Sequence, residues 1–360
     1  MTAADSTGVV LSGGGAFGAY EVGVLKALLN GDSPATDYRP IDPGIYTGTS
    51  VGSYNAAIMC SRPGRPATDV IAELEELWLG RIANTLGSCG NGVYRLRGAP
   101  FQFFDPGCLA QPVRSLAKLG EDAAVLATAG LVKGAQFVTS DAPLKSRLLS
   151  LADLSVFISE SPFKRLLTDT VDLDGLRRSD KRLVVAASNW QRGIVQLYRN
   201  REIADVVGTD AILASAALPG VFPPVFIDGV PYVDGGVTLN TPLKPAIDDG
   251  ATTVHVIFVD PRIENFKLPL LPSTLDTFYR MLAVIWAANV RKDVLLMADG
   301  AYRHKLSVHI HRPQTPLGGG DELLDFQRTK LASTVEIGYR DAVNHDCEVS
   351  ECVRIGRRQP

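Results

Sequence analysis

A serine flanked by glycines lies early in the chain, in the segment Gly48-Thr49-Ser50-Val51-Gly52. The segments on either side, 43–47 and 53–60, predict a short strand and a helix. A nucleophile on a tight strand-to-helix turn needs glycine two residues away on each side, because larger side chains would crowd the turn. We therefore take Ser50 as the candidate nucleophile. The alternative is a chance G-x-S-x-G in a chain with 34 glycines.

A glycine-rich loop near the N-terminus offers backbone donors for an anion. Residues 8–11 predict a buried strand, Ser12-Gly13-Gly14-Gly15 follows it, and a helical pattern begins near Tyr20. Backbone N–H groups at the start of a helix bind anions, helped by the helix dipole. The loop lacks the spacing of a dinucleotide site and the lysine of a P-loop. We expect the N–H groups of Gly13, Gly14 and Gly15 to form an oxyanion hole.

An aspartate ends a later strand-like segment, where Pro231-Tyr232-Val233 leads into Asp234-Gly235-Gly236. The two glycines allow a sharp turn, so the carboxylate is expected at the carboxyl edge of the sheet. A serine nucleophile needs a base, and Asp234 is the candidate. The alternative is an aspartate that only caps a turn, which is the role we assign to Asp228 before Gly229.

Strand-like and helical segments alternate along the chain. This pattern predicts an α/β fold, a three-layer α/β/α sandwich around a mainly parallel central sheet. The length of 360 residues suits a single domain, 1–360, with a core at 8–260. We expect a helical, lid-like insertion at about 80–175 and a C-terminal helical extension at about 270–345, ending in a helix at 321–343.

Aromatic residues gather in the first part of the expected insertion, between residues 80 and 112. They predict either a lid over an apolar pocket or a loop fixed against the core. The residues concerned are Tyr94, Phe101, Phe103 and Phe104.

Charge and hydropathy exclude several classes of function. The net charge of -3 and a pI near 6.0 give no basic field for nucleic acid. The N-terminal residues lack the positive region of a signal peptide, and no apolar run reaches the roughly 18 residues of a membrane span. We expect a cytoplasmic protein that is peripheral at membranes at most.

The cysteines and acidic residues predict no metal and no cofactor. The five cysteines, an odd number, include no C-x-x-C pair, which argues against a disulfide framework and a zinc site. We expect Cys347 and Cys352 to be free thiols. No calcium-loop pattern is present, so a metal-independent protein is expected. The five are Cys60, Cys89, Cys108, Cys347 and Cys352.

The ordered set of glycine loop, G-x-S-x-G and Asp-Gly-Gly resembles the patatin-like phospholipase family. The segment 215–224 is similar to a block that such proteins carry between the serine and aspartate motifs. The resemblance covers residues 8–60 and 182–245 well. It implies a lipid acyl hydrolase of phospholipase A or lysophospholipase type that works through a Ser-Asp dyad. Asp234 would take the proton of Ser50, the glycine loop would hold the oxyanion, and water would resolve the acyl-enzyme.

One residue departs from the family pattern. Members often carry Arg or Lys within the glycine loop, where this chain has Phe17. A cation for a phosphate headgroup is therefore missing at that position. Neutral glycerides or simple esters remain open as substrates beside phospholipids.

Three alternatives to the Ser-Asp hydrolase stay open. A Ser-Asp-His triad would use His255, but this histidine lies inside a predicted strand, which favours a histidine packed in the sheet. His304, His309 and His311 show no metal-ligand spacing. A non-catalytic lipid-binding protein and acyl transfer to another acceptor are the other two. The expected partner is a lipid or fatty-acyl ester, met by transient contact with a membrane or micelle; the oligomeric state is left open.

Overall fold

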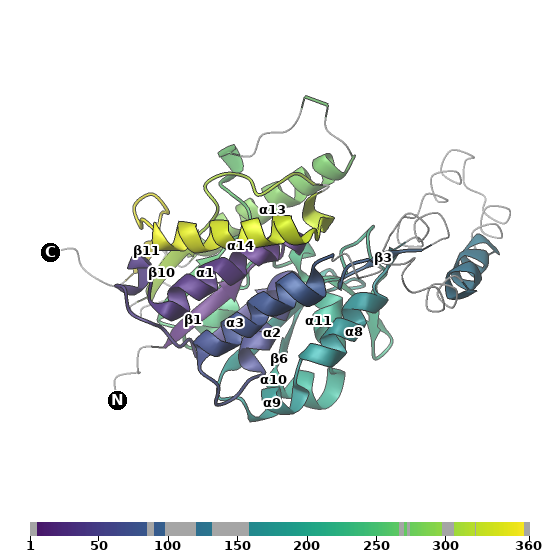
Figure 1. Ribbon diagram of the computed structural model, residues 1–360, viewed down its shortest axis with the longest axis horizontal. Helices are drawn as coiled ribbons and strands as arrows, with labels where there is room; N and C mark the ends of the chain where they lie inside the picture. The colour runs from purple at the N-terminus through teal and green to yellow at the C-terminus, as the bar shows by residue number, and fades with distance from the viewer. Residues whose placement is uncertain are drawn as a thin grey trace.

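A mixed sheet of nine strands forms the centre of the molecule (Figure 1). The computed structural model describes residues 6–84, 90–97, 120–131, 158–265, 270–271, 274–296, 306–320 and 322–355. The strand order is β11-β10-β9-β1-β2-β5-β8-β7, and β6 also pairs with β5. The strands are β1 (Thr7–Leu11), β2 (Ile45–Thr49), β5 (Arg182–Asn189), β6 (Ile194–Arg199), β7 (Val225–Ile227), β8 (Val230–Asp234), β9 (Thr253–Ile257), β10 (Leu306–His311) and β11 (Val353–Ile355).

The five middle strands β10, β9, β1, β2 and β5 run parallel, whereas β6, β7, β8 and β11 pair antiparallel at the two sides. The mainly parallel sheet predicted from the sequence is confirmed. Parallel strands are buried on both faces when helices cover both sides. In β1, Val9 and Leu11 pack on one face and Val10 on the other, and all three are fully buried.

Helices cover both faces of the sheet, so the fold has three layers. The face of Val9 and Leu11 packs against α1 (Gly18–Asn30), α2 (Val51–Cys60), α3 (Ala67–Leu77) and α14 (Arg328–Val343). The face of Val10 packs against α12 (Leu243–Asp248). Further helices include α8 (Ser161–Thr170), α9 (Leu173–Arg178), α10 (Asn200–Glu202), α11 (Asp210–Ser215) and α13 (Thr274–Leu296).

Helix α14 lies directly against α1 (Figure 1). Their backbones come so close that glycine is required: a Cβ on Gly23 would overlap the carbonyl oxygen of Val335, and one on Gly338 would overlap that of Tyr20. The terminal helix predicted at 321–343 begins only at Arg328. The chain before it turns inward to bury Phe326, and a short 3-10 helix, η9 (Glu322–Leu324), precedes that turn.

Much of the expected insertion, including Phe101, Phe103 and Phe104, lies outside the described residues. Its described parts include β3 (Arg95–Leu96) paired with β4 (Ile158–Ser159), and a helix at 120–131. The hydroxyl of Tyr94 donates to the carbonyl oxygen of Leu324 at 2.9 Å, and its ring meets Phe326 edge-on. Tyr94 therefore fixes its own part of the loop against the core. No described helix is long and apolar enough to cross a membrane.

Candidate active site

Ser50 occupies a strained turn between β2, which ends at Thr49, and α2, which begins at Val51. Its φ of 54° and ψ of -127° are unfavourable for a residue with a side chain and are typical of functional sites. A Cβ on Gly48 would overlap the Gly52 carbonyl oxygen, and one on Gly52 would overlap that of Leu11. The strand-turn-helix geometry predicted from the sequence is present, and both glycines are needed for it.

The register of β5 brings Ser50 and Asp234 together. Thr49, the last residue of β2, pairs with Ala186, and Asp234, the last residue of β8, pairs with Ala187. β2 and β8 lie on either side of β5 and run in opposite directions. Their last residues therefore lie opposite neighbouring residues of β5. The Ser50 side chain lies close enough to the Asp234 carboxylate to lower its pKa. Both residues are buried, with 8% and 5% of their surfaces exposed.

Asp234 is held as a carboxylate that can accept a proton near neutral pH. Burial raises its pKa to about 6, and the Gly236 N–H and the Ser50 side chain limit the rise. The Gly236 N–H donates to Asp234 Oδ1 at 2.7 Å. A Cβ on Gly235 would overlap the Ala186 carbonyl oxygen, so this tight turn requires glycine. A base with a pKa close to the working pH suits general base catalysis.

The glycine loop, residues 12–15, lies beside Ser50, and Gly13, Gly14 and Gly15 line the same cavity as Ser50 and Asp234. The Gly13 N–H already donates to the Asn240 carbonyl oxygen at 3.3 Å. Within the described part of the chain, the N–H groups of Gly14 and Gly15 have no such acceptor. Of the three predicted donors, these two N–H groups thus remain available among the described residues.

Two residues that position the pair were not assigned a role from the sequence. Ser215 Oγ accepts the Ser50 N–H at 2.8 Å and donates to the Ala186 carbonyl oxygen at 2.6 Å. The Asp234 N–H donates to the Ala217 carbonyl oxygen at 2.9 Å. The segment 215–224, noted only as a family block, therefore orients the backbones of both Ser50 and Asp234. In the sequence, only its position between the G-x-S-x-G and Asp-Gly-Gly motifs pointed to such a role.

A cavity of about 290 Å³ opens at Ser50 and Asp234, and its walls are almost wholly apolar. Among the described residues that line it, the charged ones are Asp234 and Glu160. Several lining side chains are also exposed, among them Trp190, Met281 and Ile285, so the mouth has an apolar rim. The inner wall includes Tyr54, Trp78, Ile82, Phe163, Leu213, Phe222, Leu282 and Phe326.

His255 is absent from the described residues that line this cavity. It lies in the middle of β9, where its Nδ1 is 3.2 Å from His311 Nε2 and its ring stacks on His309. Burial lowers its pKa to about 3, so it is neutral at pH 7. The interpretation of His255 as a sheet histidine is confirmed, and the triad lacks the necessary geometry. His304 lies outside the described residues.

Phe17 is likewise not among the described residues that line the cavity. It is buried, its ring centroid lies 6.2 Å from that of Tyr279, and it packs with Trp286 and Leu323 in a small apolar cluster. The Trp286 Nε1–H donates to the Gly236 carbonyl oxygen at 2.7 Å. Phe17 therefore packs α13 against the glycine loop. The side chains that could share a metal ion, His309, His345, Cys347 and Cys352, are not among the lining residues either.

The family model for patatin-like phospholipases matches residues 9–247. The chain belongs to the patatin-like phospholipase family. A patatin-like phospholipase domain-containing protein of Cryptococcus neoformans is 35% identical over 106 residues, which are 28% of this chain and 10% of that protein. The triacylglycerol lipase ptl2 of Schizosaccharomyces pombe is 37% identical over 81 residues, 22% of this chain and 12% of the lipase. The matches thus span about a tenth of these patatin-like relatives.

Two solved structures are similar to this patatin-like chain at 15% identity. VipD from Legionella pneumophila aligns with 92% of this chain and 67% of its own, at a TM-score of 0.37. The type III effector ExoU aligns with 93% of this chain and 53% of its own, at a TM-score of 0.28.

Proposed function

We propose that this patatin-like protein is a serine hydrolase of lipid carboxylic esters, of phospholipase A or lysophospholipase type. The observation that carries the proposal is that Ser50 and Asp234 lie together in the lining of one apolar cavity. The backbone strain at Ser50 supports it, because such strain persists only where the surrounding structure enforces it.

In the first step, Asp234 accepts the Ser50 proton while Ser50 Oγ attacks the acyl carbonyl carbon. The carbonyl oxygen becomes an oxyanion, which the N–H groups of Gly14 and Gly15 stabilise, together with Gly13 if its bond to Asn240 lengthens. The intermediate collapses, the C–O bond to the leaving alcohol breaks, and the proton on Asp234 passes to that alcohol. The acyl group remains as an ester on Ser50.

In the second step, Asp234 accepts a proton from water, and the resulting hydroxide attacks the acyl-enzyme carbonyl. The same donors hold the second oxyanion. Its collapse releases the fatty acid, and the proton returns from Asp234 to Ser50 Oγ. The dyad needs no histidine, in keeping with the position of His255 in the sheet.

The apolar cavity and its rim support a substrate with a long acyl chain. Burying each CH₂ group contributes about 0.8 kcal/mol, so the apolar walls favour long chains. Leu270 and Leu271, just before α13, are 97% and 89% exposed, and Met281 and Ile285 are exposed on α13 itself. These side chains would enter the surface of a membrane or micelle during transient contact.

Neutral glycerides are a second candidate class, favoured by the charges of the site. No Lys or Arg occurs among the described residues that line the cavity, and Phe17 is used for packing. A phosphate headgroup would therefore meet no cation there, and Glu160 would repel it when ionised. A neutral ester needs no cation in the cavity and is not repelled by Glu160.

Covalent labelling tests the proposed function. A fluorophosphonate probe should label the protein at Ser50, and Ser50→Ala and Asp234→Asn should each abolish both labelling and fatty acid release from a panel of phospholipids and glycerides. His255→Ala is the matched control and should keep both. Labelling that persists in Ser50→Ala, or chemistry that vanishes in a folded His255→Ala, would overturn the dyad. A protein that binds lipid without labelling would be the non-catalytic alternative.

A further inference from the structure

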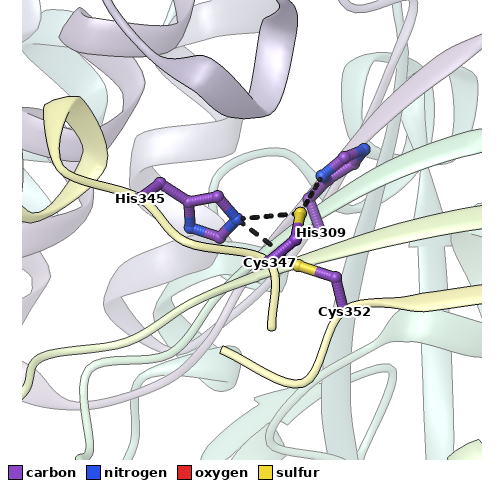
Figure 2. Close-up of side chains that lie close together, drawn as sticks. All are labelled: His309, His345, Cys347 and Cys352. Carbon is purple, nitrogen blue, oxygen red and sulfur yellow. Dashed lines mark hydrogen bonds between the residues drawn. The ribbon is translucent and has the colours of Figure 1, made fainter. Parts of the chain in front are cut away.

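Three side chains from residues 345–352 meet His309 from β10, and all four are of types that can bind a metal ion (Figure 2). His309 comes from β10, His345 and Cys347 follow the end of α14, and Cys352 directly precedes β11. Their candidate ligand atoms all lie within 4.8 Å of one another. Figure 2 shows both imidazole rings turned toward the two sulfur atoms.

The separations between these atoms fit one tetrahedral cation. Cys347 Sγ lies 3.4 Å from both His309 Nδ1 and His345 Nε2, and Cys352 Sγ lies 3.4 Å from His345 Nε2. Zn–S bonds of about 2.3 Å and Zn–N bonds of about 2.0 to 2.1 Å at tetrahedral angles separate sulfur and nitrogen by about 3.5 Å. Hydrogen bonding alone would require His345 Nε2, which is 3.4 Å from both sulfur atoms, to share one proton or one lone pair between them.

We propose that His309, His345, Cys347 and Cys352 form a structural zinc site. Two thiolates and two imidazoles in tetrahedral arrangement are a typical ligand set for zinc. Four protein ligands leave no open position, so the expected role is structural. The proposal is independent of the chemistry at Ser50.

The loop that carries the two cysteines is held in shape by its own hydrogen bonds. The Cys352 N–H donates to the Cys347 carbonyl oxygen at 3.0 Å. The Asp346 carboxylate accepts from the N–H groups of Glu348 and Val349 at 2.8 and 3.2 Å. Cys352 Sγ also accepts the Ile310 N–H at 3.4 Å, a bond that would stabilise a thiolate. The ligands are thus positioned before any cation binds.

Binding a cation here must release protons from the thiols. Imidazoles bind a metal ion as neutral rings, and cysteines bind it as thiolates. Zn²⁺ therefore binds two thiols with loss of two protons to solvent, and the two thiolates neutralise its charge.

The site would join three elements at the edge of the sheet. It links β10 to the three-residue strand β11 and to the end of α14. Since α14 packs closely on α1 through Gly23 and Gly338, and α1 follows the glycine loop, the cation would fix the scaffold behind that loop. The site could not be predicted from the sequence, because the two cysteines do not form a C-x-x-C pair and His309 lies in β10, far from them along the chain.

Metal content of the intact chain is the direct test. Protein expressed with zinc in the medium and purified under reducing conditions should carry about one zinc per chain by elemental mass spectrometry. Replacement by Co²⁺ should give intense tetrahedral ligand-field absorption and a thiolate-to-cobalt charge-transfer band. Removal of the metal with a chelator should lower the temperature of unfolding. These measurements need no variant, so they stand even if a variant fails to fold.

Variants then locate the ligands. The double variant Cys347→Ser/Cys352→Ser should bind zinc at least about 100-fold more weakly, which is more than the loss of a residue that only hydrogen-bonds to a metal ligand costs. Cys60→Ala is the matched control, since Cys60 is a buried free cysteine outside the cluster, and it should keep the zinc and the cobalt spectrum. Less than stoichiometric zinc without a charge-transfer band, zinc unchanged in the double variant, or a Cys347–Cys352 disulfide in the isolated protein would each overturn the proposal.

Discussion

Asn240 holds Gly13 at two points: its carbonyl oxygen accepts the Gly13 N–H, and its Nδ2–H donates to the Gly13 carbonyl oxygen, each at 3.3 Å. The residue follows the Asp-Gly-Gly turn, so this pair of bonds ties the loop of the proposed base to the glycine loop. Asn240 is buried, and its Oδ1 has no protein partner within the described residues. The side chain therefore serves the position of Gly13 and borders the cavity.

Asn240→Ala should lower kcat roughly 10-fold and leave KM nearly unchanged. One hydrogen bond of the clamp is lost, which is worth about 0.5–1.5 kcal/mol, and misplaced oxyanion donors affect the transition state more than the bound ester. Steady-state kinetics on a soluble ester measure both constants. Asn189→Ala is the matched control, because Asn189 is a buried asparagine at the end of β5 whose Oδ1 accepts the Arg192 N–H instead. An unchanged kcat in folded Asn240→Ala would refute the role.

Hydrolysis should decline as the pH falls below about 6, with kcat/KM dropping about tenfold per unit. Asp234 acts as a base only when deprotonated, and burial raises its pKa to about 6. A soluble ester is the right substrate, because a lipid surface has its own pH dependence. Asp260 is a matched control, since burial raises its pKa to about 6 as well. The fall in kcat/KM at low pH should persist in Asp260→Asn. If it disappeared in that variant, Asp260 and not Asp234 would be the carboxylate that titrates.

The same pKa shift affects stability with a defined sign. A carboxyl group whose pKa is raised on folding stabilises the protein at low pH, and this stabilisation is lost as the pH rises through about 6. The shift of about two units corresponds to about 3 kcal/mol at most. Asp234→Asn removes the buried charge, so it should unfold at a higher denaturant concentration than the parent at pH 8 and lose this advantage at pH 4.

Acyl-chain preference should follow the dimensions of the cavity. Activity on a series of esters should rise up to about fourfold for each CH₂ that is buried and then level off when the cavity is full. Leu213→Trp fills part of the inner wall, so its plateau should come at a shorter chain. Phe226→Trp is the control, since Phe226 is exposed on β7 and outside the described lining. If activity levelled off at the same acyl-chain length in Leu213→Trp and in the parent, the acyl chain would bind elsewhere.

The sequence was informative where the requirements are local. The turns at Ser50 and Asp234 need glycines at fixed spacing, and buried strands need apolar runs, so these features could be read directly. The roles of Ser215 and Asn240 could not, because each acts on a backbone far away in the chain. Phe17 looked like a missing cation and is a packing residue between the glycine loop and α13.

The approach of His309 to Cys347 and Cys352 was hidden for a related reason. It depends on β10 and β11 pairing antiparallel at the edge of the sheet, with Val308 opposite Val353. Spacing along the chain does not reveal such a pairing, because the connection between the two strands is long and includes α14. Cys347 and Cys352 are free cysteines, as the sequence predicts, but their spacing does not reveal the two histidines beside them.

The pairing of Asp234 with Ala187 has a consequence for how this protein can vary. Side chains alternate between the two faces of a sheet, so a slip of β8 by one residue along β5 would turn the carboxylate away from Ser50. The distance between Ser50 and Asp234 is thus set by a hydrogen-bonded ladder and not by loop conformation. The hairpin turn at Asp228 and Gly229 can change in length without moving this pair, whereas one residue gained or lost within β8 would separate the two side chains.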